Sequence, residues 1–192
     1  MPSPSWLIQM RKRLANALAA FWGLAEATVF FIVPDVLLSW LALRGLRPAL
    51  LACLYALAGA LVGGTAIWVI AQQDPEYLRQ LYMRIPAIDA AMLGNVQSQL
   101  EATGLIALFI GPLIGTPYKI YALEAAVLEL GFIAFLLVSI PARLIRFVLV
   151  ASIVAFLNRG LARRLSLRQR QGLLLACWTG FYAWYFHVMG TA

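Results

Sequence analysis

The feature that most restricts the fold of this chain is a run of 23 residues, 49–71, without a charged side chain. About 20 apolar residues in a helix cross a bilayer. Lipid offers the backbone no hydrogen-bond partners, so a spanning segment is a helix or part of a closed barrel. This run is continuously apolar instead of alternating, which favours a helix. Only 12% of the 192 residues are charged, too few for the surface of a soluble domain. The sequence therefore predicts an all-α integral membrane protein.

Apolar stretches recur along the chain and predict a single membrane domain over residues 1–192. The stretches are 14–43, 49–71, 103–128, 130–157 and 173–189. In the second, small residues such as Gly59 and Gly63 recur at helical spacing, which predicts the close approach of a neighbouring helix. The last stretch, 173–189, ends in an aromatic run typical of a membrane interface. We expect it to form an extra C-terminal transmembrane helix.

Two of the stretches are interrupted. Residues 14–43 are too many for one span and contain Glu26 and Pro34-Asp35, whereas residues 103–128 contain Gly111-Pro112 and Gly115-Thr116-Pro117. Each stretch predicts two half-helices joined by a turn near mid-membrane, which is a re-entrant hairpin. Such a break is tolerated only where protein or a water-filled cavity surrounds it.

Residues at the breaks also predict where the second half-helices begin. Thr116 is a natural N-cap, and Pro117 is favoured at the first helical position. In the first stretch, Asp35 is expected to cap a half-helix that begins near Val36.

The net charge of +7 and the pI near 9.9 would suit a nucleic-acid-binding protein. The basic residues, however, flank the apolar stretches, where such residues set orientation on the cytoplasmic side. We therefore attribute these cations to membrane topology, in preference to nucleic-acid binding or a specific site for anionic lipid. With re-entrant hairpins, Arg79 and Arg84 lie outside, and ten cations lie inside: Arg11, Lys12, Arg13, Arg44, Arg47, Arg159, Arg163, Arg164, Arg168 and Arg170.

Full crossing of both interrupted stretches would give the same ten-to-two ratio, so charge does not choose between the topologies. Segment length and the internal breaks favour hairpins. The order hairpin–span, hairpin–span with opposite orientation then predicts an inverted repeat, with a site between the broken elements. The polar connection, residues 75–101, has apolar residues at three- and four-residue steps. It predicts an amphipathic helix on the membrane surface.

Six charges lie inside the apolar stretches: Glu26, Asp35, Lys119, Glu124, Arg143 and Arg146. By insertion scales, each costs about 2.5–3.5 kcal/mol at the centre of a span. Arg143 and Arg146 share a helix face, after an expected break at Pro141. Lys119 lies in the first turn of its half-helix, where a cation opposes the helix dipole unless an anion binds there. These charges predict a substrate or proton path, with structural ion pairing as the alternative.

Other chemistry finds little support in the sequence. Cys53 and Cys177 are isolated and indicate neither a zinc site nor a disulfide. No nucleophile–base pair, phosphate loop or metal-ligand spacing is present. We therefore expect no enzyme activity, no cofactor and no metal.

The order of several motifs resembles the DedA family of bacterial membrane proteins, within the broader VTT-domain (SNARE-associated) superfamily. Glu26 with residues 30–38 resembles the first hairpin of that family, and residues 59–65 its glycine-rich span. Gly111-Pro112 with residues 116–119 resembles the second hairpin, and Pro141 with Arg143 and Arg146 the basic helix. The resemblance covers about residues 20–157. Lys119 stands where many members have arginine.

The resemblance implies a multi-pass protein of the bacterial cytoplasmic membrane. It would move phosphate-bearing lipids, including undecaprenyl phosphate, between leaflets as a flippase or scramblase, with proton coupling. Lys119, Arg143 and Arg146 would hold the phosphate, and Glu26 and Asp35 would carry protons. To these we add Thr116 and Tyr118 as substrate-binding residues and Glu124 as a third coupling acid. The alternatives are a structural scaffold and an ion-coupled transporter of a small anion, and a homo-oligomer stays open.

Overall fold

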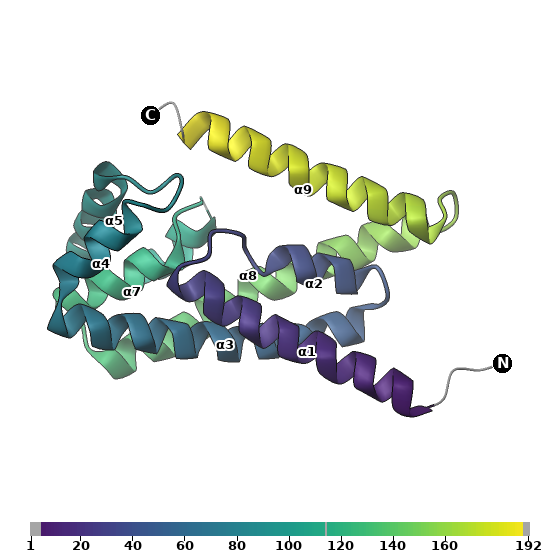
Figure 1. Ribbon diagram of the computed structural model, residues 1–192, viewed down its shortest axis with the longest axis horizontal. Coiled ribbons are helices and arrows are strands. Elements are labelled where there is room, and N and C mark those ends of the chain that lie inside the picture. Colours follow the sequence, from purple (N-terminus) through teal and green to yellow (C-terminus); the bar gives the residue numbers. More distant parts are fainter. Residues whose placement is uncertain (1–4, 114, 190–192) are drawn as a thin grey trace.

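The chain forms a series of helices joined by short turns (Figure 1). The computed structural model describes residues 5–113 and 115–189, and all regular secondary structure within these ranges is helical. This confirms the all-α prediction. The α-helices are α1 (Ser5–Thr28), α2 (Asp35–Ala42), α3 (Leu46–Gln73), α4 (Pro75–Tyr82), α5 (Ala90–Thr103), α6 (Ala107–Ile110), α7 (Tyr118–Val127), α8 (Phe132–Leu161) and α9 (Leu167–Met189). Two 3-10 turns, Gly104–Ile106 and Gly111–Leu113, flank α6.

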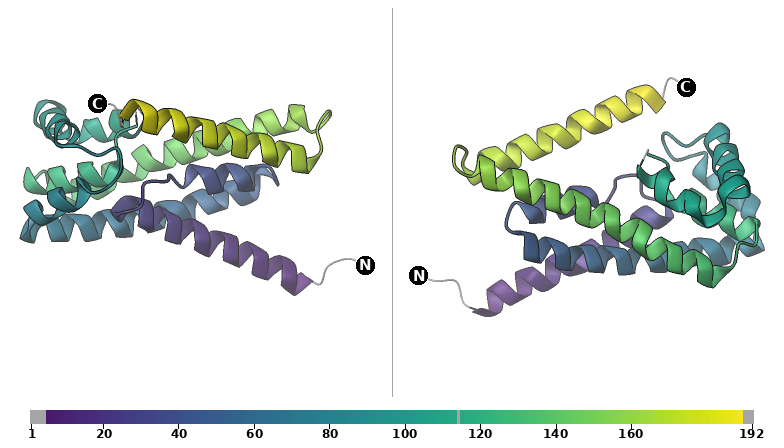
Figure 2. Two further views of the ribbon diagram at one scale, coloured as in Figure 1. Left: turned by 45° about the horizontal axis from the view of Figure 1, so that its top comes forward. Right: turned by 180° about the vertical axis from the view of Figure 1, so that it is seen from behind.

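Two of the described helices, α3 and α8, are long and apolar enough to cross a membrane. They have 28 and 30 residues and run in opposite directions past one another (Figures 1 and 2). α8 continues through Pro141, so the expected break there is wrong. Proline removes one hydrogen bond from the helix interior, and membrane helices tolerate this loss where neighbouring groups satisfy the freed carbonyl.

Large apolar side chains on α8 point away from the other helices. They recur every three or four residues before Pro141 and again after it, and a five-residue step between Ile140 and Ile145 moves the exposed side to another face of the helix. They are Ile133, Leu137, Ile140, Ile145, Leu149, Ile153 and Phe156, and the most exposed, Phe156, is 73% accessible. Exposed apolar side chains along the whole length of a helix are typical of a surface covered by lipid or by a partner.

The first interrupted stretch reverses direction between α1 and α2 (Figure 1). The break spans residues 29–34, because α1 continues past Glu26 to Thr28. Asp35 is the first residue of α2 and not its cap. The N-cap is Pro34, without a side-chain capping bond, because the Asp35 carboxylate pairs with Arg146 instead.

The second interrupted stretch is broken before Pro117, and its described residues 104–113 form only short helical turns. The expected cap at Thr116 is wrong. Pro117 is the N-cap of α7, since its ψ of 134° is still extended, and no side chain caps this helix. Both breaks lie at the predicted glycines and prolines.

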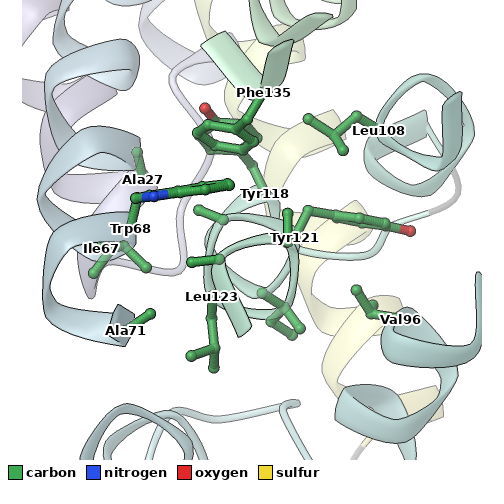
Figure 3. Packing of buried hydrophobic residues seen from close by; sticks show 14 of the residues in the cluster. Ala27, Ile67, Trp68, Ala71, Val96, Leu108, Tyr118, Tyr121, Leu123 and Phe135 are labelled. Carbon is green, nitrogen blue, oxygen red and sulfur yellow. The ribbon is translucent and has the colours of Figure 1, made fainter. Parts of the chain in front are cut away.

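Each second half-helix packs against the span that follows the other break. α2 lies against α8, whereas α7 lies against α3. Around α7 the core is aromatic: Trp68 of α3 contacts Phe135 of α8 with ring centroids 5.0 Å apart, and the Tyr118 ring stacks on Phe135 at 5.8 Å (Figure 3). The interrupted stretches are therefore held inside the bundle by the two long helices.

The predicted approach of a helix to the small residues of α3 is confirmed, and that helix is α1. A Cβ atom at Gly59 would overlap the Ala20 carbonyl of α1, and one at Gly23 would overlap the Ala56 carbonyl of α3. Backbone therefore meets backbone along this contact, which only glycine permits.

The connection 75–101 forms two helices, α4 and α5, so the single predicted helix is wrong. Pro86 and Ala87, whose φ is 67°, lie in the turn between them. The amphipathic pattern itself is correct, because Leu78, Tyr82 and Val96 are buried.

The last helix, α9, covers the predicted segment 173–189 and lies along the edge of the bundle beside α2 (Figure 1). Its first turns carry Arg168 and Arg170, and it is not one of the two helices with the length and apolarity of a span.

Candidate functional site

Five of the predicted site residues come together between the breaks and α8: Glu26, Asp35, Lys119, Arg143 and Arg146. We call them the charge cluster. The innermost contact joins Arg143 of α8 to Glu26 of α1. Both guanidinium Nη atoms donate to the carboxylate, one to Oε1 at 3.3 Å and the other at short range to Oε2. Arg143 is fully buried and Glu26 is 3% exposed. This bidentate geometry is the strong form of an arginine–carboxylate pair.

The second ion pair lies one helical turn further along α8. Arg146 Nη2 donates to Asp35 Oδ2 at 2.6 Å, and Nη1 donates to the Pro112 carbonyl at 3.2 Å. Arg146 therefore connects the start of α2 with the second break. The two arginines flank one ring, Phe147, with their Cζ atoms 4.9 and 5.7 Å from its centroid.

Lys119 completes the charge cluster from α7. It is 1% exposed, and its Nζ donates to the Phe30 carbonyl in the first break at 2.7 Å. A backbone carbonyl is neutral. Among the described residues, no carboxylate forms an ion pair with this cation. With the two acids ionised, three cations against two carboxylates give the charge cluster a formal charge of +1.

Two members of the charge cluster occupy unfavourable helix ends. Glu26 lies in the last turn of α1, where a negative charge opposes the helix dipole, and Lys119 lies in the first turn of α7, where a positive charge does the same. Neither position stabilises its own helix. The two charges are held by neighbouring elements, so their positions reflect the site and not helix formation.

Tyr118 lies under the charge cluster. Its hydroxyl donates to Ser139 Oγ at 3.0 Å, and the Arg143 Cζ atom is 4.7 Å from its ring centroid. The face of an aromatic ring attracts a cation at this range. The position opposite is Gly64 of α3, where a Cβ atom would be 2.5 Å from the Tyr118 hydroxyl. Tyr118 therefore bounds the site on the side of α3.

Three polar atoms of the charge cluster are buried without a hydrogen-bond partner among the described residues. They are Asp35 Oδ1, Arg143 Nε and Arg146 Nε. The two nitrogens are donors and the oxygen is an acceptor. The charge cluster therefore retains hydrogen-bonding capacity that its own ion pairs do not use.

Two predicted site residues lie outside the charge cluster. Glu124 of α7 is 1% exposed and pairs with Arg79 of α4, which donates from Nε at 3.1 Å and from Nη2 at 2.7 Å. The hydrogen bonds to Glu124 raise the pKa of the Arg79 guanidinium further above its usual range. Thr116 lies in the second break, where its backbone N–H donates to the Gly111 carbonyl at 3.0 Å.

The contacts of α9 with the site are not predicted by the sequence. The Tyr182 hydroxyl accepts a hydrogen bond of 2.9 Å from the Val33 N–H in the first break, and Trp178 Nε1 donates to Ser39 Oγ of α2 at 2.9 Å. Phe186 packs on Phe31 with centroids 5.5 Å apart. The aromatic run of 181–187 was a usable signal, but it was assigned to a membrane interface.

Among residues 5–113 and 115–189, no three His, Cys, Asp or Glu side chains lie close enough together to hold a metal ion. The polar groups of the charge cluster are cations, hydroxyls and paired carboxylates. Its cations outnumber its carboxylates, so its charge is complementary to an anion.

Comparison with known proteins identifies one relative and no family. An uncharacterized protein of Haemophilus influenzae is 26% identical over 151 residues, covering 77% of this chain and 78% of that protein. No family model matches, and no solved structure matches. The relative shares this length of sequence but brings no described activity.

Proposed function

We propose that this chain is a multi-pass membrane protein of the DedA type that moves phosphate-bearing lipids, such as undecaprenyl phosphate or phospholipids, between the leaflets of the bacterial cytoplasmic membrane. The observation that carries the proposal is the position of Lys119. It is a fully buried cation at a helix start, held only by a carbonyl, beside two arginines with unused donors. Helix N-termini and arginines both favour phosphate.

The arrangement of the helices supports a re-entrant topology and an inverted repeat. α3 and α8 are antiparallel, and α2 and α7 each pack on the span of the opposite half. The start of α1, the turn between α2 and α3, and the turn between α8 and α9 lie at one end of the molecule, whereas α4 and α5 lie at the other (Figure 1). The ten cations expected inside therefore share one end.

A specific observation favours a second candidate, a structural scaffold. Each carboxylate of the charge cluster has an arginine partner, and such pairs hold segments together without any ligand. The two candidates differ in what Lys119 does. In a scaffold it only ties α7 to the first break, whereas in a transporter it contacts the substrate.

The deciding experiment replaces Lys119 and leaves both ion pairs in place. Lys119→Met and Lys119→Arg proteins are reconstituted in vesicles, and the transfer of fluorescent phosphatidylglycerol and of undecaprenyl phosphate between leaflets is measured. We expect a loss of at least about tenfold with methionine, from removal of one charge-assisted contact in a buried site, and partial activity with arginine.

Arg159→Met, at an exposed cation, is the matched control. Normal transfer by a folded Lys119→Met protein would exclude the lipid-transport proposal and leave the scaffold. Uptake of inorganic phosphate, measured in the same vesicles, identifies a transporter of a small anion instead.

A further inference from the structure

A second cationic site lies at the opposite end of α2 from the charge cluster. The first half of α1, the end of α2 with the turn after it, and the start of α3 line a partly open pocket of about 650 Å³. Arg11, Lys12, Arg44 and Arg47 line it, together with Leu41 and Leu51. Asp35 and Ala42 are the two ends of α2, which at about 1.5 Å per residue holds the two sites roughly 10 Å apart.

The four cations of this pocket have no acidic counterpart. No carboxylate lines the pocket, and the ion pairs of the described residues all involve other side chains. All four cations are exposed. Neighbouring like charges repel one another, and an anion among them would remove this repulsion. The pocket is therefore complementary to a concentrated negative charge.

The apolar surroundings identify the kind of anion. Leu51 in the pocket is 47% exposed, and an apolar strip continues from it along α3 through Leu54 and Tyr55, which are 52% and 43% exposed. Leu14 and Leu18 of α1, next to the cationic turn, are 59% and 46% exposed. A free phosphate would gain nothing from these side chains, whereas a lipid would place its acyl chains along them.

We propose that this pocket binds the phosphate headgroup of an anionic phospholipid at the membrane surface, with its acyl chains along α1 and α3. Basic pockets between membrane helices are suited to such headgroups. The site shares no residue with the charge cluster, so it goes beyond the proposed transport function. It would exist equally in a scaffold.

The test is a binding measurement on the purified full chain in detergent, not a transport assay. Bound phosphatidylglycerol and phosphatidylcholine are counted by native mass spectrometry, with lipid titrated into each sample. Wild type should prefer phosphatidylglycerol. Arg44→Gln/Arg47→Gln should weaken phosphatidylglycerol binding roughly 10- to 30-fold, as expected for removing two cations near a lipid surface.

Arg11→Gln/Lys12→Gln provides a second variant from a different helix and should give a similar loss. Arg163→Gln/Arg164→Gln is the matched control, because it removes two exposed cations at the same end of the molecule but outside the pocket. Thermal unfolding of each variant checks that it is folded.

Three outcomes would overturn the proposal. The first is equal binding of the two lipids by wild type, and the second is an equal loss in the control variant, which would indicate a diffuse basic surface. The third is displacement of phosphatidylglycerol by millimolar inorganic phosphate, which would make free phosphate the ligand. Failure of lipid transfer with normal lipid binding would contradict only the transport function.

Discussion

The chain buries arginine–carboxylate contacts in two places, and the two are built differently. At the far end of α7, Glu124 accepts two hydrogen bonds from Arg79, whose side chain is 28% exposed. In the charge cluster, Arg143 and Glu26 are both inaccessible, and Asp35 and Arg146 beside them are nearly so. The Arg79–Glu124 pair connects α4 to α7, whereas the charge cluster connects both breaks to α8.

Burial alone therefore does not distinguish a structural ion pair from a candidate functional site. The Glu124 carboxylate has both oxygens occupied, and Arg79 reaches water. The charge cluster keeps an unpaired Asp35 oxygen, two unused arginine donors and a lysine without a carboxylate. The Glu124–Arg79 pair balances its own charges, whereas the charge cluster has one more cation than it has carboxylates.

The largest expected effect is that of removing Arg143. Arg143→Met leaves the buried Glu26 carboxylate without its arginine partner, and breaking a buried pair in this way costs about 3–5 kcal/mol. We expect a lower unfolding temperature and loss of lipid transfer. Unfolding followed in detergent gives the stability. The double variant Glu26→Gln/Arg143→Met should recover much of it, and an unstable double variant would contradict an origin in the unpaired charge.

Removing the acids tests whether the charge cluster carries protons. Glu26→Gln and Asp35→Asn retain oxygen acceptors for the arginines, although each removes a counter-charge and should lower stability. In the folded variants, the dependence of lipid transfer on pH should be abolished, because substrate phosphate and protonation of an acid are linked through the same cationic field. Transfer is measured in sealed vesicles across a pH gradient. Glu124→Gln is the comparison. If only Glu124→Gln removed the pH dependence, the two regions would have exchanged roles.

A smaller effect is expected at the other pair. Arg79→Met should cost about 1–3 kcal/mol, since it leaves a buried carboxylate without its donors but near a partly open surface. Lipid transfer by the folded protein should be unchanged. The same two assays measure both quantities. A loss of transfer as large as that of Lys119→Met would end the distinction between the two regions.

The smallest effect is expected at the contact between α9 and the first break. Tyr182→Phe removes one hydrogen bond, from the Val33 N–H, and should cost about 0.5–1.5 kcal/mol. Hydrogen exchange at residues 29–34 should increase, with Tyr55→Phe as a control at an exposed tyrosine of α3. Unchanged exchange would show that α9 does not hold the first break.

The sequence predicts the elements better than their contacts. The positions of α3 and α8 follow from composition, and the breaks follow from Pro34, Gly111 and Pro117, which limit backbone geometry locally. Pro86 marks the turn between α4 and α5, whereas the apolar periodicity of 75–101 by itself indicates one helix. Contacts between distant segments have no such local signature: Glu26 and Arg143 are separated by 117 positions.

The position of Glu124 could have been predicted. It was grouped with the other acids only because it lies in an apolar stretch. Five positions along an α-helix correspond to about 140°, so Lys119 and Glu124 point to different sides of α7. Helical register therefore separates Glu124 from the charge cluster. Its partner, Arg79, was missed because the helix that carries it was placed on the membrane surface.

The position of α9 offers a site for a fluorescent label that would report on the breaks' surroundings. α9 bonds to the first break through Tyr182, and the Tyr185 hydroxyl lies 3.5 Å from the Gly115 carbonyl in the second. The two cysteines differ in access, because Cys53 is buried and Cys177, beside Trp178 on α9, is exposed. A thiol-reactive dye would therefore label α9 and leave the core untouched. Its emission would respond to changes in the surroundings of α9 without any group being introduced among the charges.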